Sequence, residues 1–222
     1  MISLSDLKKF KADGRKFSCL TCYDASMAKA MEVAEVDSIL VGDSLGMCIQ
    51  GRDSTLPVTV ADMAYHTAAV RRGNQHAFIM TDLPFMSYAT VQETLANACT
   101  VMQAGAQMVK MEGGAWLSES IEILTRNGIP VCVHLGLTPQ SVHVFGGYKL
   151  QARTREAADK LIADCRAVVE AGAAVLLLEC VPAQLGKEIT ELFPHMPVIG
   201  IGAGGDTDGQ VLVVQDMLGL TF

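Results

Sequence analysis

The sequence lacks the features of a membrane protein and of a nucleic-acid-binding protein. No apolar run approaches the ~18 residues needed to span a bilayer, and residues 1–6 lack the basic and then apolar pattern of a secretory signal. Charged residues make up 18% of the 222 residues, the formal net charge is −7, and no basic cluster occurs. We therefore expect a cytoplasmic protein with no membrane or nucleic-acid partner, which binds a small molecule instead.

The sequence also lacks the even, regularly spaced cysteines of a disulfide framework. Its seven cysteines are scattered and lie mostly inside apolar segments, which favours reduced core thiols. Cys19 and Cys22 match the spacing of a redox or zinc pair, but residues three apart in an extended strand point to opposite faces. We interpret both cysteines as structural.

Short apolar runs alternate with segments of helical periodicity along the whole chain. Half of the residues are hydrophobic, and this alternation implies a parallel sheet covered by helices. Eight expected strands favour a single catalytic domain over residues 1–222, an α/β protein with the (β/α)8 (TIM) barrel fold and a short N-terminal helix. The chain stops soon after the eighth strand, so we expect the eighth helix to be missing. The expected strands are 17–21, 38–41, 77–81, 108–111, 131–134, 175–178, 198–201 and 210–214.

Helical periodicity and end signals predict the segments between these strands. Thr59 is placed to cap a helix, with Asp62 three residues further on. Residues 46–57 and 135–151 are expected to be long irregular loops, and a loop as long as the second is usually functional or disordered. The expected helices are 3–12, 25–35, 59–72, 90–103, 117–126, 154–171 and 182–192.

Four acids follow or end apolar runs at equivalent positions. They are Asp43, Asp82, Glu112 and Glu179, and in a barrel the carboxyl ends of the strands share one mouth. Two carboxylates ~5 Å apart repel by on the order of 3 kcal/mol at an effective dielectric of ~20, and a cation would relieve this repulsion. Oxygen ligands without clustered His or Cys favour Mg²⁺ over zinc.

Each of these residues also has a purely structural interpretation. Lys110 and Glu112 share a face of one strand, so Lys110 either pairs with Glu112 inside the barrel or binds a substrate carboxylate or enolate. Any of the acids could cap the following helix, and for Asp43 and Ser44 taken alone the helix cap is favoured. Four acids at matched positions make that explanation harder to apply throughout. His134 taken alone is more typical of a hydrogen-bonded structural histidine.

Two further features carry little functional signal. The glycines in 200–205 match the spacing of a dinucleotide fingerprint, but no strand-ending acid lies about 20 residues beyond them. We interpret them as a tight turn that lets a substrate approach the backbone. The other histidines have no distinctive setting and are interpreted as surface or packing residues: His66, His76, His143 and His195.

Eight motifs, in order and over nearly the whole chain, closely resemble ketopantoate hydroxymethyltransferase. This resemblance is highly specific because it covers the strand-end acids, the lysine, the histidine and the long loop together. The motifs are VGDSLG (41–46), DSTLPVT (53–59), YHT (65–67), DLPF (82–85), VKMEGG (109–114), HLGLTPQS (134–141), FGGYK (145–149) and ECVP (179–182).

The resemblance implies a Mg²⁺-dependent (β/α)8 barrel enzyme that transfers a hydroxymethyl group from 5,10-methylenetetrahydrofolate to 3-methyl-2-oxobutanoate. The products would be 2-dehydropantoate, on the route to pantothenate and coenzyme A, and tetrahydrofolate. It also implies a homo-oligomer, often a decamer, and a chain that continues past the equivalent of Phe222. By motif, Asp43, Asp82 and Glu112 would bind the metal, Asp43, Ser44, Asp82, Lys110 and His134 would line the substrate site, and Glu179 would accept the proton.

These implied roles are chemically reasonable. A 2-oxo acid chelates a divalent ion through its carboxylate and keto oxygens, and the ion then stabilises the enolate that forms when the C3 proton leaves. A carboxylate in an apolar setting, such as Glu179, can have its pKa raised toward the working pH, as a base requires. We expect residues 135–151 to cover the site and limit the access of water.

Two other classes of protein remain as alternatives. One is a related metal-dependent barrel enzyme that makes or breaks a carbon–carbon or carbon–phosphorus bond of an oxo acid. The other is a non-catalytic barrel whose acids hold a structural ion. A structural ion site has little need of an inward lysine and a spare base, so Lys110 and Glu179 argue against the second alternative.

Overall fold

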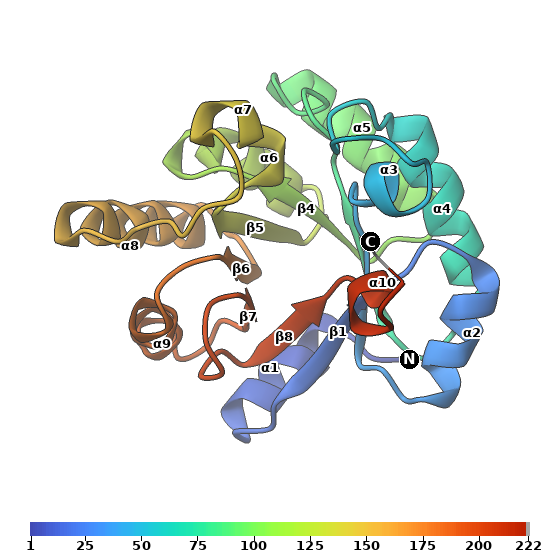
Figure 1. Cartoon of the computed structure of the whole chain (residues 1–222), viewed down its shortest axis with the longest axis horizontal. Coiled ribbons are helices and arrows are strands. Elements are labelled where there is room, and N and C mark those ends of the chain that lie inside the picture. Colours follow the sequence, from blue (N-terminus) through green and yellow to red (C-terminus); the bar gives the residue numbers. More distant parts are fainter. Residues whose placement is uncertain (221–222) are drawn as a thin grey trace. The chain divides into compact units, whose positions relative to one another are not determined.

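The computed structural model describes residues 1–220, and within them eight parallel strands follow one another in sequence order around a closed barrel (Figure 1). The (β/α)8 fold expected from the alternating pattern is therefore confirmed. The strands are β1 (Phe17–Thr21), β2 (Ser38–Val41), β3 (Phe78–Asp82), β4 (Met108–Glu112), β5 (Val131–Gly136), β6 (Val175–Glu179), β7 (Val198–Ile201) and β8 (Gly209–Leu212).

Helices of very different length connect the strands. The longer ones are amphipathic and match the expected segments to within two residues at most ends. The helices are α1 (Leu4–Ala12), α2 (Ala25–Val33), α3 (Leu45–Cys48), α4 (Val60–Gly73), α5 (Val91–Gln103), η1 (Ala115–Leu117), α6 (Ser118–Arg126), η2 (Pro139–Ser141), α7 (Val142–Phe145), α8 (Arg155–Glu170), α9 (Ala183–Leu192) and α10 (Val214–Met217).

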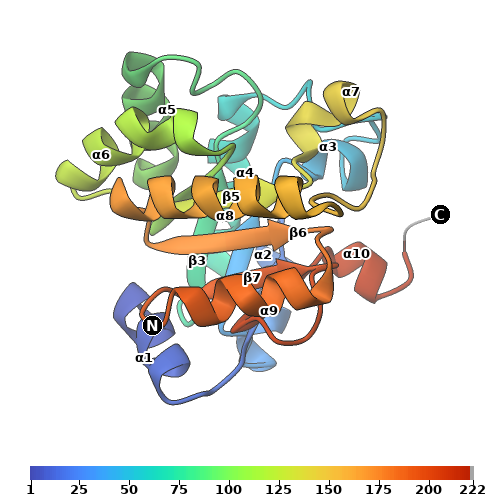
Figure 2. The same ribbon diagram turned by 90° about the vertical axis from the view of Figure 1, so that its left-hand side faces the viewer.

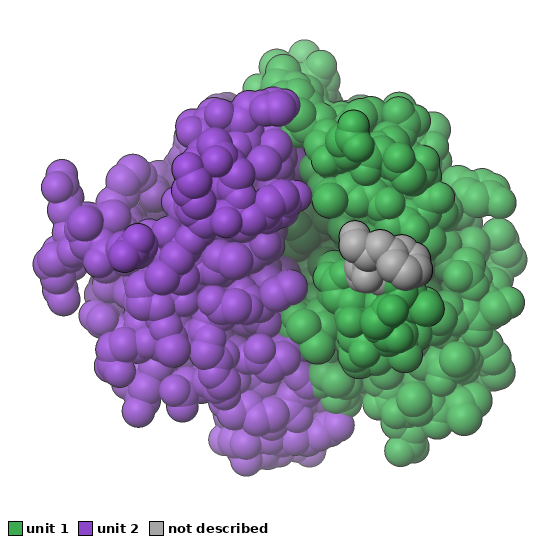
Figure 3. Space-filling model, in the orientation of Figure 1, with its two compact units in different colours: residues 1–3, 18–110, 211–222 green, residues 4–17, 111–210 purple. Residues whose placement is uncertain are grey.

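The chain divides into two compact units, shown in green and purple in Figure 3. The first unit contains residues 1–3, 18–110 and those from 211 onward, and the second contains residues 4–17 and 111–210. Strands β1, β4 and β8 each contribute residues to both units.

In the first unit, β2 and β3 pair in parallel register from Ser38 with Phe78 to Val41 with Thr81. All four residues of β2 and all five of β3 are buried, as expected for strands covered on both faces. Helices α2 and α4 pack against each other beside these strands (Figure 1), and Gly73 allows α4 to approach the backbone of Ala25. This packing places the exits of β2 and β3 side by side.

In the second unit, β5 and β6 pair from Cys132 with Val175 to Gly136 with Glu179, and β6 continues to pair with β7. Helices α8 and α9 lie on the outside of these strands, which is clearest in Figures 1 and 2. Helix α1 belongs to the same unit, where Lys11 donates to Asp208 at 2.7 Å and to the carbonyl of Thr190.

The structure differs from the expectations where the elements are short. Helix α3 overlaps the start of the predicted loop 46–57, and η2 and α7 lie within the predicted loop 135–151. A short helix, α10, also follows β8, where no helix was expected, and β8 ends at Leu212 instead of residue 214. A four-residue helix completes about one turn, so it leaves no 3.6-residue periodicity in the sequence.

The predicted state of the cysteines is confirmed, since all seven thiols are free and four of them are buried. Burial raises the pKa of Cys19 to about 12 and that of Cys22 to about 11. Both thiols therefore stay protonated at neutral pH, which is unfavourable for redox chemistry or metal binding. Within residues 1–220, no helix has the length and apolar character that crossing a membrane requires.

Candidate active site

The predicted site residues lie at or near the carboxyl ends of their strands. Asp82, Glu112 and Glu179 are the last residues of β3, β4 and β6, and Asp43 follows β2 by two positions. Most of their side chains are buried, with Ser44 and Glu179 partly accessible. Strands β2 and β3 and the start of β4 place one group of these residues in the first unit, and the end of β4 together with β5 and β6 places the other in the second.

In the first unit, Asp82 is held by two partners. Its Oδ1 atom lies 3.0 Å from Nζ of Lys110, and its Oδ2 atom accepts the backbone N–H of Asp43 at 3.0 Å. The ion pair follows from the sheet register, which sets Asp82 directly opposite Lys110. Both side chains are about 3% exposed, so each charge compensates the other away from water. The buried lysine thus has an acidic partner on the neighbouring strand.

Ser44 follows Asp43 in the sequence, but its side chain does not cap a helix. It occupies the position before α3, and its side chain makes no capping hydrogen bond there. Instead, its Oγ atom lies 2.8 Å from the hydroxyl of Tyr23. The helix-cap interpretation is therefore wrong for Ser44, because the hydroxyl has a partner in tertiary structure.

Gly42 explains how the turn after β2 brings these groups together. A Cβ atom at this position would lie 2.9 Å from Ser44 Oγ and 3.5 Å from Asp82 Oδ2. A side chain at Gly42 would therefore displace the Ser44 hydroxyl, whereas its contact with Asp82 would be an ordinary one.

Tyr23 and His66 are residues of the same network that the sequence patterns did not single out. Tyr23 is 2% exposed, and its backbone carbonyl accepts a hydrogen bond from Nδ1 of His66 on α4 at 2.7 Å. Interpreting His66 as a packing residue was incomplete, because its ring holds the segment after β1. The one available signal was the position of Tyr23 just past a strand end, where barrel sites are built.

In the second unit, His134 lies between two carboxylates. Its Nδ1 atom is 3.4 Å from Glu112 Oε1, and its Nε2 atom is 3.1 Å from Glu179 Oε2. Glu112 also accepts the backbone N–H of Gln140 at 2.9 Å through its Oε2 atom. The side chain of Glu179 is 16% exposed, whereas that of Glu112 is 2% exposed. Glu179 is therefore the carboxylate of this group that a ligand can reach.

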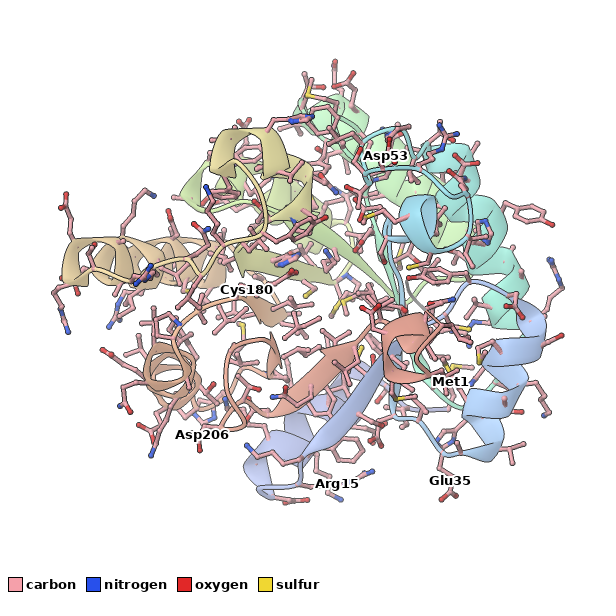
Figure 4. The ribbon with its side chains drawn as sticks, in the orientation of Figure 1. Met1, Arg15, Glu35, Asp53, Cys180 and Asp206 are labelled. Carbon is pink, nitrogen blue, oxygen red and sulfur yellow. The ribbon has the colours of Figure 1, made fainter. Side chains whose placement is uncertain are left out.

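The backbone around Glu179 is fixed by close contacts. Its carbonyl accepts the N–H of Leu137, and Gly136, with φ of 89°, approaches that carbonyl too closely for any side chain. The next residue, Cys180 (labelled in Figure 4), has φ of 48°, in the left-handed region. These restraints hold the end of β6 in one conformation.

The glycines in 200–205 have a packing role that was not predicted. A Cβ atom at Gly202 would lie 3.4 Å from the sulfur of Cys180, and one at Gly204 would lie 2.6 Å from the Cβ of Ala183. Both glycines have positive φ. They let the segment after β7 pack against the segment after β6, and the approach of a substrate to this turn stays a prediction.

The oxygen atoms of the site differ from the ligand set of a preformed metal centre. Within residues 1–220, no three or more His, Cys, Asp or Glu side chains form a group arranged to hold a metal ion. The buried Asp82 carboxylate, which contacts the backbone of the buried Asp43, nevertheless suits Mg²⁺, because this ion takes one or two carboxylates and completes its shell with water and substrate oxygens. The set Asp43, Asp82 and Glu112 stays a prediction.

A closed parallel barrel with acids, a lysine and a histidine at its strand ends is the architecture of a barrel enzyme. The sequence comparison makes this specific. The family model described as ketopantoate hydroxymethyltransferase matches residues 1–222, and the chain belongs to that family of transferases. A 3-methyl-2-oxobutanoate hydroxymethyltransferase from Acinetobacter baumannii (strain SDF) is 86% identical over 222 residues, which are 100% of this chain and 82% of the relative.

Solved structures share the fold at low sequence identity. A phosphonopyruvate hydrolase in complex with oxalate and Mg²⁺ superposes with a TM-score of 0.74 at 12% identity, over 99% of this chain and 84% of the other. A 2,3-dimethylmalate lyase, described as a member of the PEP mutase/isocitrate lyase superfamily, gives 0.70 at 14% identity, over 99% and 83%. At these identities the likeness concerns the fold alone.

Proposed function

We propose that this protein transfers a hydroxymethyl group from 5,10-methylenetetrahydrofolate to 3-methyl-2-oxobutanoate, giving 2-dehydropantoate and tetrahydrofolate, as a step of pantothenate biosynthesis. One water molecule is consumed and supplies the oxygen of the new hydroxyl group. The observation that carries the proposal is the 86% identity, over the whole chain, to a relative named for this keto acid. The buried Lys110 and the accessible Glu179 supply the cation and the base that the reaction needs.

The first-unit residues bind and orient the keto acid in this proposal. The Lys110 ammonium attracts the substrate carboxylate, and Asp82 holds that ammonium in place at 3.0 Å. Ser44 donates a hydrogen bond to an oxygen of the substrate through its partly accessible hydroxyl. Asp43 is fixed beside them through its N–H bond to Asp82.

Glu179 removes the C3 proton of the keto acid, and the resulting enolate carbon forms a bond to the one-carbon unit that the folate supplies. Both C–N bonds of that unit break, each folate nitrogen takes a proton, and water supplies the oxygen of the new hydroxyl group. His134 Nε2 lies 3.1 Å from Glu179 Oε2, so the ring limits the positions that the carboxylate can take as it accepts the proton. His134 in this proposal lines the substrate site and positions the base.

Mg²⁺ is the proposed cofactor, held by Asp43, Asp82 and Glu112. When bound, it would polarise the keto and carboxylate oxygens of the substrate and so increase the acidity of the C3 proton. The solved relative of this fold in complex with oxalate and Mg²⁺ gives a precedent for a small dicarboxylate and this ion together. We also propose a cytoplasmic homo-oligomer, with the decamer implied by the family resemblance, which light scattering would test.

The first prediction concerns the proton-transfer step. The protein with Mg²⁺ should exchange the C3 proton of 3-methyl-2-oxobutanoate for deuterium in D₂O, followed by NMR, without folate. Glu179→Gln should reduce the exchange rate by at least about 100-fold, the range expected for loss of a general base. Removal of the metal with EDTA should also stop exchange, and added Mg²⁺ should restore it.

Glu188→Gln, a change of the same kind at an exposed position of α9, is the matched control and should exchange at the wild-type rate. Full turnover is then measured with both substrates present. Absence of exchange and turnover in folded wild-type protein would refute the proposed function. Exchange that survives Glu179→Gln would instead assign the base to another residue.

A further inference from the structure

An exposed, positively charged segment follows β5 in the second unit. Residues 123–155 contain no aspartate or glutamate and form the longest stretch of the chain without either, although the formal net charge of the chain is −7. Two cations of this stretch, Lys149 and Arg153, are exposed. In the part of the chain that the structure describes, neither of them forms an ion pair. Residues 142–153, the cationic segment, therefore offer two charges to an anion.

The cationic segment is attached to the end of β6. The N–H of Gln151 donates to the carbonyl of Cys180 at 2.7 Å, and Cys180 directly follows Glu179, whose carboxylate a ligand can reach. Figure 2 shows this part of the chain in gold, between α7 and the start of α8. Lys149 and Arg153 are each two residues from Gln151, so their backbones lie within about 7 Å of this contact. The fold therefore holds both cations near the proposed base.

The same segment also exposes apolar side chains. Tyr148 is 56% exposed, Leu150 is 47% exposed and Val144 is 85% exposed. Gly146 and Gly147 both have positive φ, so the chain turns sharply just before the tyrosine. An exposed aromatic ring packs well against another flat ring. The segment thus presents a ring and two cations on one short stretch of surface.

The folate co-substrate has the properties that this surface complements. Its aminobenzoyl group is a flat ring, and its glutamate end carries two carboxylates. Its one-carbon unit must reach the carbon from which Glu179 removes a proton, so the folate must lie beside the end of β6. Exposed cations attract an anion from solution and direct its approach. The glutamate end can therefore lie on the cationic segment while the one-carbon unit lies at the site.

We propose that Tyr148, Lys149 and Arg153 bind the outer end of the folate. The ring of Tyr148 packs against the aminobenzoyl ring, and the two cations attract the glutamate carboxylates. This inference rests on the proposed function, because it names a binding surface for the co-substrate of that reaction. These residues take no part in the proton transfer, so they set the affinity for folate and not the rate of the chemical step.

The test compares the KM values for the two substrates in the double variant Lys149→Gln, Arg153→Gln. Its KM for 5,10-methylenetetrahydrofolate at low salt should rise about five- to tenfold, since each exposed ion pair contributes about two- to fivefold. Its kcat and its KM for the keto acid should stay within about twofold of wild type. Added salt should raise the KM for folate of the wild type more than that of the variant.

The double variant Arg166→Gln, Lys187→Gln is the matched control. It removes two exposed cations from α8 and α9 of the same unit, so it changes the net charge by the same amount. Both KM values should equal those of the wild type. Circular dichroism and thermal unfolding establish that each variant is folded.

A change in the co-substrate and a change at Tyr148 test the two contacts separately. 5,10-Methylenetetrahydropteroate lacks the glutamate, so its KM should differ by less than about twofold between wild type and the Lys149→Gln, Arg153→Gln variant. Tyr148→Phe keeps the ring and should stay within about twofold of wild type, whereas Tyr148→Leu should raise the KM for folate about threefold or more.

The outcomes separate this inference from the proposed function. If wild type turns over and the Lys149→Gln, Arg153→Gln variant has the wild-type KM for folate, the inference is wrong while the function stands. An equal rise in KM for the pteroate, or in the control variant, also overturns it. If that variant does not fold, the Tyr148 pair decides, and equal KM values for phenylalanine and leucine overturn the inference.

A change of oligomeric mass in light scattering, without a change in the KM for folate, would assign the cationic segment to a contact between copies of the chain and overturn the inference as well. If wild type shows neither exchange of the C3 proton nor turnover, the proposed function itself fails.

Discussion

The ion pair between Lys110 and Asp82 shows how one buried contact can serve both folding and chemistry. Both side chains are about 3% exposed, and Asp82 also accepts the N–H of Asp43. Burying two charges costs several kcal/mol per ion, and the cost is offset only when the pair stays intact. Substrate binding at Lys110 would therefore use a charge that the fold has already desolvated and oriented.

Lys110→Met tests the two roles separately. It leaves the Asp82 carboxylate buried without its cation, so it should lower the free energy of unfolding by about 3–5 kcal/mol. It should also abolish turnover, since the substrate carboxylate loses its partner. Urea unfolding followed by fluorescence or circular dichroism measures the free energy of unfolding. A turnover assay with both substrates measures the activity.

The Lys110→Met, Asp82→Asn double variant serves as the comparison. Its neutral amide oxygen can still accept the N–H of Asp43, so at least half of the lost stability should return while activity stays absent. A double variant as unstable as Lys110→Met would show that Lys110 stabilises the fold through something other than Asp82. Activity in either variant would remove Lys110 from substrate binding.

At the scale of elements, the start of helix α4 can be predicted from neighbouring residues alone. Thr59 accepts the N–H of Asp62, and the Asp62 carboxylate accepts the N–H and the hydroxyl of Thr59. The hydrogen bond from the Thr59 side chain is the main reason that the pKa of Asp62 is lowered. Both partners lie three residues apart, so no tertiary contact is needed to predict the capping box.

Thr59→Ala should lower the free energy of unfolding by about 1 kcal/mol at pH 7, as is typical for loss of such a cap. The pKa of Asp62 is depressed in the folded state, so its contribution is present above the unfolded value near 3.8 and is lost as the pH falls through the folded value. The difference between wild type and variant should therefore shrink in acid. Denaturant unfolding at pH 7 and at pH 3 measures both values.

Thr100→Ala is the control for this helix cap, because the exposed Thr100 hydroxyl bonds only to the carbonyl of Ala96 in its own helix. Alanine is at least as good a helix former, so this change should leave stability within about 0.5 kcal/mol of wild type. A Thr59→Ala variant as stable as Thr100→Ala would contradict the assigned role of the cap.

Features set by neighbouring residues could be predicted from the sequence, whereas features set by contacts between distant segments could not. Strands 17–21, 38–41 and 198–201 were predicted to the residue. The last two are mostly apolar, and 17–21 alternates buried and more exposed residues. Helices α3, α7 and α10 were missed because four residues carry no periodicity. The acids of the site were found from their positions at strand ends. Tyr23 and Gln140 were not, because the hydrogen bond between Tyr23 and Ser44 and that from the Gln140 N–H to Glu112 arise only on folding.

At the scale of the whole molecule, the interior is built from aliphatic, methionine and cysteine side chains, since aromatic residues make up only 5% of the chain. Core positions such as Met63, Met80, Met108 and Met111 are at most 1% exposed. The seven thiols differ in exposure. Four are buried (Cys19, Cys22, Cys132 and Cys165), two are partly exposed (Cys48 and Cys180), and Cys99 is exposed.

This distribution predicts the reactivity of the native protein toward a thiol reagent. The reagent attacks the thiolate, so access and pKa both limit the rate. Cys99 should react first. Cys48 and Cys180 should react more slowly, because burial raises the pKa of each thiol, and their rates should rise as the pH is increased from 7 toward 9. The four buried thiols should react only as the protein unfolds, with the pKa of Cys19 and of Cys165 raised by burial to about 12.

Mass spectrometry of the native protein after limited reaction with iodoacetamide would count these classes directly, with a guanidinium-unfolded sample as the reference in which all seven cysteines are modified. Cys99→Ser should remove the fast phase and leave the others unchanged. Because reaction of the buried thiols requires opening of the barrel, their rate should fall when Mg²⁺ and keto acid are added, since ligands that bind only the folded state oppose unfolding. Rapid labelling of Cys19 or Cys165 in native protein would mean that the strands and helices around them open far more readily than their complete burial implies.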